Sequence, residues 1–277
     1  MTLPAGARDA RRVGGGDINE AFHVVLADGS DAFVKTRPDA AAGEYAAEAA
    51  GLRWLAEPSA LRTPRVLAVE ERYLALEWVS AGRLDSAGAE ELGRGLAATH
   101  AAGADAFGAT GPGRHARFGS LALSNDPTAD WPTFYAERRL RPLARIGRER
   151  EALSHRTLDA VERVCERLHE LAGPPEPPAR LHGDLWTGNV MAGADGRPWL
   201  IDPSAYGGHR EVDLAMLRLF GAPSDRVFAA YDEIAPPAPG WADRVELYQL
   251  LPLLVHALLF GGSYRSAAER VALHYAG

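Results

Sequence analysis

The sequence is poor in cysteine and lysine and has no long apolar run. Its single cysteine, Cys165, excludes an intrachain disulfide framework and a metal site built from several thiolates. The most apolar stretch, residues 247–260, is too short to span a bilayer and contains Gln249, Pro252 and His256. The first residues show no apolar core of the kind that secretory signal peptides carry. We therefore expect a protein of the reducing cytoplasm.

Basic residues are also fewer than acidic residues. The 277 residues include 30 Lys+Arg against 37 Asp+Glu, which gives a formal net charge of −7. Nucleic-acid-binding proteins usually present a basic face, and proteins that bind anionic membranes carry basic clusters, so we expect neither kind of partner. With 47% hydrophobic and 24% charged residues, the chain has the composition of a globular protein with one large domain or two lobes.

Lys35 is the only lysine, and all the other Lys+Arg positions are arginines. Together with the many alanines, glycines and prolines, this indicates a codon bias that replaces lysine by arginine. A lysine that persists against such a bias is expected to need a compact ammonium group, because the planar guanidinium of arginine has a different shape and hydration. Lys35 is therefore a candidate functional residue.

The chain divides into a β-rich first part and a helical remainder. We expect an N-terminal lobe of residues 1–79 and a C-terminal lobe of residues 80–277. In the first lobe, alternating apolar residues and the Asp28-Gly29 hairpin signal predict four strands and one helix. The strands span residues 21–26, 32–36, 64–69 and 73–79, and the helix spans residues 44–57.

Apolar residues at three- and four-residue steps predict helices after Ser80. They span residues 86–100, 131–145 and 158–171. A proline-rich break at residues 173–178 follows, then a short loop over residues 181–190 and a strand over residues 198–202. The remainder, residues 211–275, is expected to be mostly helical.

The strongest local signal is a set of polar residues between Arg180 and Asp202. Asp184 and Asn189 lie five residues apart on one loop, and Asp202 ends the strand that follows. Phosphoryl transfer needs one carboxylate to accept the proton of the attacking hydroxyl, and an amide and a second carboxylate to hold Mg²⁺. The order His-x-Asp-x₄-Asn, then Asp on a later strand, is that of the kinase catalytic loop and metal-binding aspartate. We predict Asp184 as the base, with Asn189 and Asp202 as the metal ligands.

The N-terminal part supplies residues suited to a nucleotide. A glycine-rich turn that includes Gly15, Gly16 and Asp17 can place backbone N–H groups over phosphates. In kinases a strand lysine contacts the α- and β-phosphates and is held by a helix glutamate. We predict that role for Lys35, with Glu48 as its partner and Glu44, one helical turn earlier, as the alternative.

Residues 74–79 join the two parts of the chain. In a kinase, the backbone of this segment reads the nucleotide base. We predict that the Glu77 carbonyl and the Val79 amide have this role, with Trp78 between them. The same residues also suit an ordinary buried strand.

The motif from His182 to Asn189, His-Gly-Asp-Leu-Trp-Thr-Gly-Asn, resembles that of the aminoglycoside-phosphotransferase-like kinases, with Asp202-Pro203 in place of Asp-Phe-Gly. Within that group, Trp186 two residues after the base resembles the fructosamine (ketosamine) kinase family. Other stretches resemble the same family over nearly the whole chain. They are residues 16–20, which resemble its phosphate loop and add Ile18 and Asn19 to the ATP site, residues 131–142, residues 201–216 and residues 260–265.

This resemblance implies a two-lobed α+β fold of the protein-kinase type, with ATP and Mg²⁺ in the cleft. It implies phosphorylation of the 3-hydroxyl of ketosamines, which are amine–sugar adducts such as fructosamines and ribulosamines, in a deglycation repair. Trp186 and His256 would border the substrate. Only eight residues separate Asp202 from residue 211, too few for the activation loop of a protein kinase. We expect a monomer.

Several alternatives stay open from the sequence. A kinase of the same fold could phosphorylate an aminoglycoside, choline or homoserine, and a nucleotide-binding protein without turnover could share the fold. Trp186 also suits core packing, and His256 suits a core histidine with satisfied hydrogen bonds. We expect Cys165 to be an inert core residue, and Asp213 to support the catalytic loop instead of contacting substrate.

Overall fold

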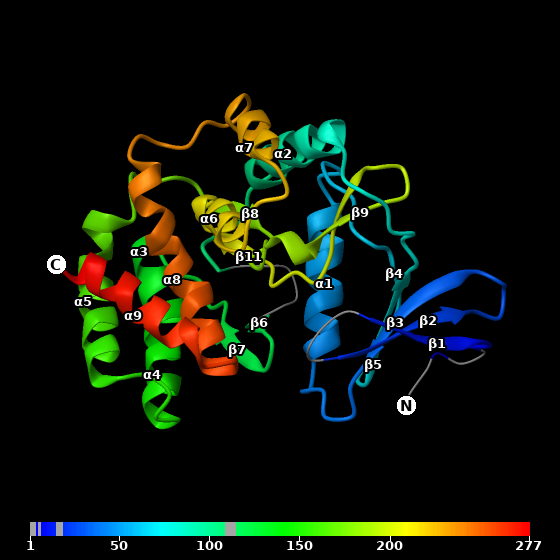
Figure 1. The fold of residues 1–277 in the computed structure, drawn as a ribbon, viewed down its shortest axis with the longest axis horizontal. Helices are drawn as coiled ribbons and strands as arrows, with labels where there is room; N and C mark the ends of the chain where they lie inside the picture. Colours follow the sequence, from blue (N-terminus) through cyan, green and yellow to red (C-terminus); the bar gives the residue numbers. More distant parts are fainter. Residues whose placement is uncertain (1–3, 5–6, 15–18, 109–114) are drawn as a thin grey trace.

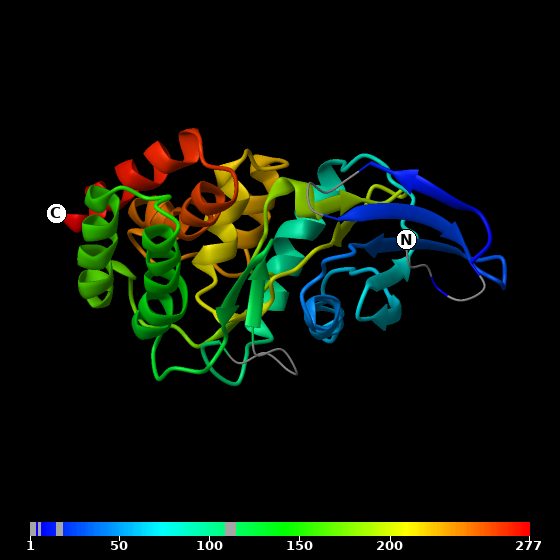
Figure 2. The ribbon, with the colours of Figure 1, turned by 90° about the horizontal axis from the view of Figure 1, so that it is seen from below.

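The computed structural model describes residue 4 and residues 7–14, 19–108 and 115–277. The chain forms two lobes, a small β-rich N-terminal lobe and a larger helical C-terminal lobe (Figure 1). Figure 2 shows the two lobes at opposite ends of the long axis. No helix in the described ranges combines the length and apolarity needed to cross a membrane. The exact lobe boundary, between residues 79 and 80, stays a prediction.

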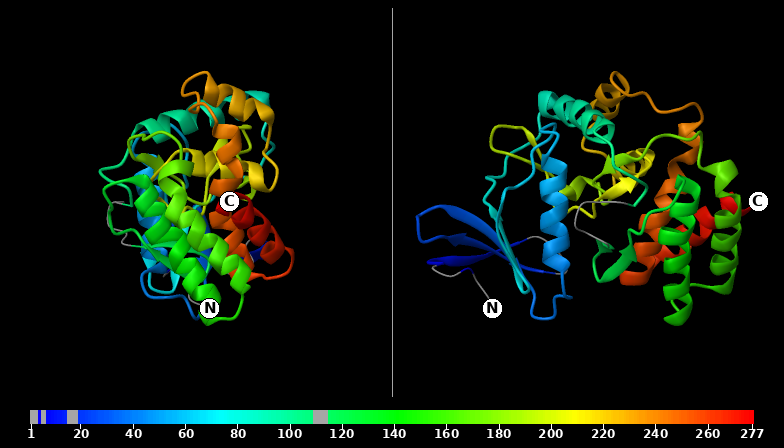
Figure 3. Two further views of the ribbon diagram at one scale, coloured as in Figure 1. Left: turned by 90° about the vertical axis from the view of Figure 1, so that its left-hand side faces the viewer. Right: turned by 180° about the vertical axis from the view of Figure 1, so that it is seen from behind.

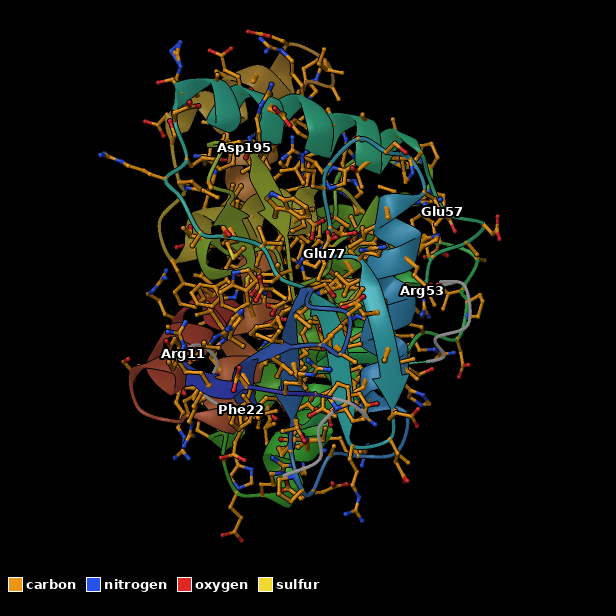
Figure 4. The ribbon with its side chains drawn as sticks, turned by 90° about the vertical axis from the view of Figure 1, so that its right-hand side faces the viewer. Arg11, Phe22, Arg53, Glu57, Glu77 and Asp195 are labelled. Carbon is orange, nitrogen blue, oxygen red and sulfur yellow. The ribbon has the colours of Figure 1, made fainter. Side chains whose placement is uncertain are left out.

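The N-terminal lobe contains one antiparallel sheet of five strands in the order β1-β2-β3-β5-β4. Figure 4 looks at this lobe and labels Arg11 of β1, Phe22 of β2 and Glu77 of β5. The strands predicted for this lobe are present with ends that shift by a few residues, and β1 is an addition. Their bounds are β1 (Ala10–Val13), β2 (Glu20–Val25), β3 (Asp31–Thr36), β4 (Val66–Glu70) and β5 (Tyr73–Glu77).

The two faces of β3 have different neighbours, because successive side chains of a strand point to opposite faces. Ala32 and Val34 are fully buried in a cluster on one face of the sheet. Phe33 packs on the other face, against the cluster that includes helix α1 (Glu44–Ala56). Lys35 follows Phe33 by two residues, so the strand directs it toward α1 and the cleft.

Helix α1 covers the sheet and has the predicted position. Tyr45, Ala49 and Leu52 are buried in the cluster that includes Leu74 and Leu76 of β5. Helical spacing then places Glu44 and Glu48 together on an adjacent side of the helix, one turn apart. This side faces the C-terminal lobe, so α1 carries its glutamates to the boundary of the two lobes.

The C-terminal lobe is built from two apolar clusters. One lies among the helices at the far end of the molecule, and the second joins α2, α6 and α7 to Leu185 and Leu200. The elements in chain order are α2 (Ser86–Ala101), β6 (His115–Phe118), β7 (Leu121–Ser124), α3 (Trp131–Tyr135), η1 (Ala136–Leu140), α4 (Arg141–Glu149), α5 (His155–Leu171), β8 (Ala179–Leu181), η2 (Thr187–Asn189), β9 (Val190–Ala192), β10 (Pro198–Leu200), β11 (Tyr206–Gly208), α6 (Glu211–Leu219), α7 (Asp225–Asp232), α8 (Trp241–Leu259) and α9 (Ser263–Ala276).

The helical segment predicted over residues 131–145 is present without a break, but its middle part is not α-helical. A π-helix, η1, separates α3 from α4. Pro142 has no N–H to donate to the carbonyl of Arg138, and the Arg139 guanidinium donates to that carbonyl at 2.9 Å instead. Arg139 is fully buried and also donates to the Asn125 side chain at 2.6 Å. The wider turn therefore accommodates a buried arginine.

The β6–β7 hairpin lies in a region that the sequence indicated only as helical. Ala116, Phe118, Leu121 and Leu123 are buried, and the two strands pair in antiparallel register across the turn at Gly119. The hairpin lies between α1 and the C-terminal helices in Figure 1, and Figure 3, from behind, shows the same arrangement. It therefore belongs to the boundary of the two lobes.

Cys165 is buried in the core on α5, as predicted. Burial raises the pKa of its thiol to about 12. Since the thiolate is the reactive form, Cys165 is expected to be inert in the folded protein.

Candidate active site

A cleft of about 470 Å³ lies between the lobes. Its walls come from α1, the β6–β7 hairpin, the loop after β8, the loop after β10, and the adjoining parts of α8 and α9. Lys35, Glu48, Asp184, Asn189 and Asp202 all line it. The fold thus brings together five residues that the sequence placed in one phosphoryl-transfer site.

Lys35 lies between two carboxylates. Its Nζ atom is 2.5 Å from Glu48 Oε2 and 2.9 Å from Asp202 Oδ1. Glu44, the alternative partner, instead accepts from the Arg37 guanidinium at 2.7 Å. Lys35 is only 5% exposed, and this ion triad links β3, α1 and the loop after β10 inside the cleft.

The triad changes the acidities of its members. Burial alone would lower the pKa of Lys35. The negative charges of Asp202 and Glu48 have the larger effect and raise this pKa above its ordinary value. Burial raises the pKa of Glu48 to about 7, although Lys35 opposes this shift. Burial would also raise the pKa of Asp202, but the positive charge of Lys35 has the larger effect and lowers this pKa below its ordinary value. Asp202 therefore stays ionised beside a protonated lysine.

Asp184 lies beside Asn189 on the loop that follows β8. Asn189 Nδ2 donates to the Asp184 carbonyl at 2.8 Å and to Asp184 Oδ2 at 3.0 Å. The amide nitrogen of Asn189 donates both of these hydrogen bonds to Asp184. The amide oxygen of Asn189 can therefore accept from another group or bind a cation. Burial raises the pKa of Asp184 to about 7, against the effect of the Asn189 hydrogen bond.

Asp202 has an unusual backbone. Its φ angle is +53°, a left-handed conformation that residues with a side chain rarely adopt. Such conformations cluster at functional sites, where the surrounding structure holds them. Here the loop is held on both sides, because His182 Nε2 donates to the Ile201 carbonyl at 2.9 Å and the Ser204 amide donates to the His182 carbonyl at 3.0 Å. The loop that carries Asp184 and the loop that carries Asp202 are therefore joined directly.

Asp213 supports the loop that carries Asp184, as predicted. Its carboxylate accepts from the His182 amide at 2.8 Å and the Gly183 amide at 2.9 Å, and it contacts His100 Nε2 at 3.2 Å. Gly183 has a φ angle of +81°, and a Cβ atom there would lie 2.2 Å from the Ser204 carbonyl oxygen. Both features fix the backbone that presents Asp184.

Asp213→Asn should lower the free energy of unfolding by about 2–3 kcal/mol, because asparagine keeps one acceptor oxygen but turns an NH2 group toward the other of the two buried backbone N–H groups. Urea unfolding followed by circular dichroism measures this. Asp159→Asn on the exposed face of α5 is the matched control, with an expected change below about 0.5 kcal/mol. An equal loss in the two variants would contradict the supporting role of Asp213.

Trp186 and His256 lie in an aromatic wall of the cleft. The Trp186 ring is 38% exposed and meets Phe220 edge-on at 5.9 Å, so Trp186 is not a core residue. The His256 ring lies 5.1 Å from Phe220 and 4.9 Å from Tyr264, and its Nδ1 contacts the Pro252 carbonyl at 2.7 Å. Burial lowers the pKa of His256. With Phe260, these side chains form an apolar surface beside Asp184.

Of the described residues predicted to contact the nucleotide through the glycine-rich turn and the segment after β5, only Asn19 is seen to line the cleft. Asn19 lines the cleft and accepts from Tyr45 Oη at 3.1 Å. Glu77 ends β5, and the Trp78 ring packs edge-on against His23 at 4.4 Å. Their contact with a base, and that of Val79, stays a prediction. Gly15, Gly16, Asp17 and Ile18 lie outside the described residues.

The residues that suit a metal ion are few. Within the described ranges, no group of three or more His, Cys, Asp or Glu side chains could hold a metal on its own. Mg²⁺ in kinases needs no such group, because it takes one or two carboxylates or amides and completes its shell with waters and nucleotide phosphates. The half-exposed carboxylate of Asp202 and the amide oxygen of Asn189 fit this requirement.

Sequence reasoning missed Phe220, Phe260, Tyr264 and Arg117, which also line the cleft. Phe220 and Phe260 directly follow the ends of α6 and α8, and Tyr264 lies in α9, within a region predicted as mostly helical. Spacing along a helix does not show which lobe or cleft its face or its end meets. Arg117 lies on the hairpin that was not predicted. Its alternation with buried Ala116 and Phe118 was the signal available.

Comparison with known proteins identifies the family. The family model for fructosamine kinase matches residues 3–275. The chain is 35% identical to a protein of Lactiplantibacillus plantarum named "Probable ketoamine kinase", over 95% of this chain and 92% of that protein. It is 32% identical to the chloroplastic protein-ribulosamine 3-kinase of rice (Oryza sativa subsp. indica), over 95% of this chain and 77% of that protein.

Comparison with solved structures supports the same family and fold. A Thermobifida fusca protein assigned as a fructosamine-3-kinase superposes with a TM-score of 0.89 and 46% identity, over 98% of this chain and 93% of that one. An aminoglycoside phosphotransferase with 17% identity superposes with a TM-score of 0.66, over 98% of this chain and 94% of that one, which shows the kinase-like fold alone. Sequence, fold and cleft lead to one assignment. This chain belongs to the fructosamine kinase family.

Proposed function

We propose that this protein transfers the γ-phosphoryl group of ATP to the 3-hydroxyl of a ketosamine, a fructosamine or ribulosamine. The 3-phosphorylated adduct then breaks down and releases the amine, which makes the reaction a deglycation repair. The observation that carries the proposal is the ion triad of Lys35, Glu48 and Asp202 in the same cleft as the Asp184–Asn189 pair. These are the parts that phosphoryl transfer by positioning and charge stabilisation requires.

Each residue has one role in this proposal. Asp184 accepts the proton of the attacking hydroxyl, and its raised pKa suits a general base near neutral pH. Asn189 and Asp202 hold Mg²⁺, whose charge offsets that of the transferring phosphoryl group when it is bound. Lys35, oriented by Glu48, contacts the α- and β-phosphates. The remaining nucleotide contacts come from Gly15, Gly16, Asp17, Ile18 and Asn19 over the phosphates, and from Glu77, Trp78 and Val79 at the base.

The walls of the cleft favour a ketosamine over an aminoglycoside. An aminoglycoside carries several positive charges and calls for a cluster of carboxylates. The carboxylates that line this cleft already contact Lys35, Arg37 or Asn189. The exposed ring of Trp186 instead offers a flat face for the carbons of a sugar. We therefore assign the sugar to the space between Trp186 and Asp184, with His256 at its border.

The intact set of reacting groups favours an enzyme over a nucleotide-binding protein without turnover. Lys35, Asp184, Asn189 and Asp202 are all present, Lys35 in an ion pair with Asp202 and Asn189 in a hydrogen bond with Asp184. All of them come from one chain, so a monomer suffices. We place the enzyme in the cytoplasm, where ATP and reduced thiols are available.

An acceptor screen tests the proposal. In a coupled assay of ATP consumption, fructosamine and ribulosamine adducts should raise the rate far above the background without acceptor, whereas kanamycin, choline and homoserine should not. Phosphorus NMR of the product should show a phosphate ester on the 3-hydroxyl. Efficient turnover of an aminoglycoside without ketosamine activity would contradict the substrate assignment, and no turnover with any acceptor would favour the binding protein.

A further inference from the structure

The cleft has a second wall opposite the aromatic one, and it comes from β6. His115 and Arg117 alternate with the buried Ala116 and Phe118 along this strand, and all four residues adjoin the cleft. In Figures 1 and 3 the hairpin lies between α1 and the C-terminal helices, so β6 faces the space into which Asp184 and Asp202 open. This wall therefore borders the acceptor.

Arg117 is the notable side chain of this wall. It is half-buried, and its guanidinium has one hydrogen bond among the described residues, a long one of 3.4 Å from Nη2 to the Ala42 carbonyl. A guanidinium carries five N–H donors, and arginines in partly buried positions usually meet a carboxylate. No ion pair among the described parts of the chain includes Arg117.

Three other carboxylates that line the cleft, those of Glu44, Glu48 and Asp202, already have partners. Glu44 accepts from the Arg37 guanidinium at 2.7 Å and from the Ala41 amide at 3.1 Å. Glu48 and Asp202 share the ammonium of Lys35. Among the described residues, Arg117 is therefore the cation on this side of the acceptor space that contacts no carboxylate, while the aromatic side is uncharged.

The backbone fixes Arg117 close to the reacting groups. Ser204 Oγ donates to the Arg117 carbonyl, and Ser204 is only two residues after Asp202. Antiparallel pairing of Arg117 with Ala122 holds the strand from the other side. The backbone of Arg117 is thus joined to the loop that carries Asp202, while its guanidinium extends from the same strand to the Ala42 carbonyl just before α1.

We infer that Arg117 binds a carboxylate on the amine-derived part of the substrate, so that the preferred acceptors are ketosamines of free α-amino acids. This inference rests on the proposed function. In such an adduct the carboxylate follows the sugar by a short run of atoms through the amine nitrogen. With the sugar carbons on Trp186 and the 3-hydroxyl at Asp184, a carboxylate on the opposite side meets the guanidinium, which can bind it with two parallel hydrogen bonds.

A matched pair of substrates tests this inference. The fructosamine of glycine carries a carboxylate, and the fructosamine of glycinamide has the same shape without the charge. The measured quantity is the ratio of kcat/KM for the glycine adduct to kcat/KM for the glycinamide adduct. A charge-assisted hydrogen bond is worth about 1.5–3 kcal/mol, so Arg117→Gln should lower this ratio by about tenfold or more.

Two further variants guard against trivial explanations. Arg117→Lys keeps the charge and should recover part of the ratio. Arg53→Gln removes an arginine from the exposed part of α1, away from the cleft lining, and should leave the ratio and both rates at wild-type values (Figure 4).

Three other results would contradict the inference. The ratio could be equal in wild type and Arg117→Gln, or it could favour glycinamide in the wild type. Arg117→Gln could instead raise the KM for ATP equally with both acceptors, which would place the guanidinium on the nucleotide phosphates. A wild-type enzyme that phosphorylates both adducts while showing any of these results refutes the role of Arg117 alone. A wild-type enzyme that phosphorylates neither these fructosamines nor the ribulosamines of glycine and glycinamide refutes the proposed function as well.

Discussion

Asp184→Asn should lower kcat by about 10²–10⁴-fold while the enzyme still binds ATP almost as the wild type does, because a positioned general base contributes a factor of this size. The substitution keeps the volume of the side chain, and the asparagine oxygen can still accept from Asn189 Nδ2, so the loop should keep its shape. What is lost is the group that accepts the proton of the hydroxyl. A coupled assay with a ketosamine gives kcat, and titration calorimetry with ATP gives the binding constant.

The matched control for Asp184→Asn is Asp195→Asn, which lies at the exposed turn between β9 and β10 (Figure 4). Asp195 pairs with Arg62 at the surface, and exposed ion pairs of this kind contribute little to stability. Its kcat should stay within about twofold of wild type. If Asp184→Asn kept more than about a tenth of the wild-type kcat, Asp184 would not be the general base.

The chemistry of the site could be predicted from the sequence because its parts are local. Asp184 and Asn189 lie on one short loop, and Asp202 follows after a single hairpin, so spacing alone shows that they lie close together. Lys35 and Glu48 are joined by the geometry of one strand and one helix. Such short connections leave few arrangements open.

The walls of the cleft could not be predicted in the same way, because they come from distant parts of the chain. Arg117, for example, meets Ser204 across 87 residues. Apolar periodicity identified most of the helices, but it does not state which face of a helix borders a cleft. The π-helix at Ala136–Leu140 accompanies a buried contact between Arg139 and Asn125, which the local sequence pattern does not predict.

Lys35→Arg should lower kcat/KM for ATP by about a hundredfold, although the charge is conserved. The compact ammonium now meets Glu48 at 2.5 Å and Asp202 at 2.9 Å, and Lys35 is 5% exposed. A planar guanidinium is wider and cannot occupy this position between the two carboxylates without moving one of them. Displacement of Asp202 by about 1 Å would misplace the group assigned to Mg²⁺, and errors of this size cost about 10² in rate.

Initial rates over a range of ATP concentrations measure this effect, and thermal unfolding shows whether the Lys35→Arg chain still folds. Lys35→Met removes the charge and leaves Asp202 and Glu48 without their cation, so it should be at least as inactive as Lys35→Arg. Arg37→Lys is the matched control, because it exchanges the same two residue types in the neighbouring ion pair with Glu44 and should reduce the rate much less. An active Lys35→Arg enzyme with an unchanged KM for ATP would refute both the phosphate contact and the argument from the solitary lysine, since in that case any cation would serve at this position.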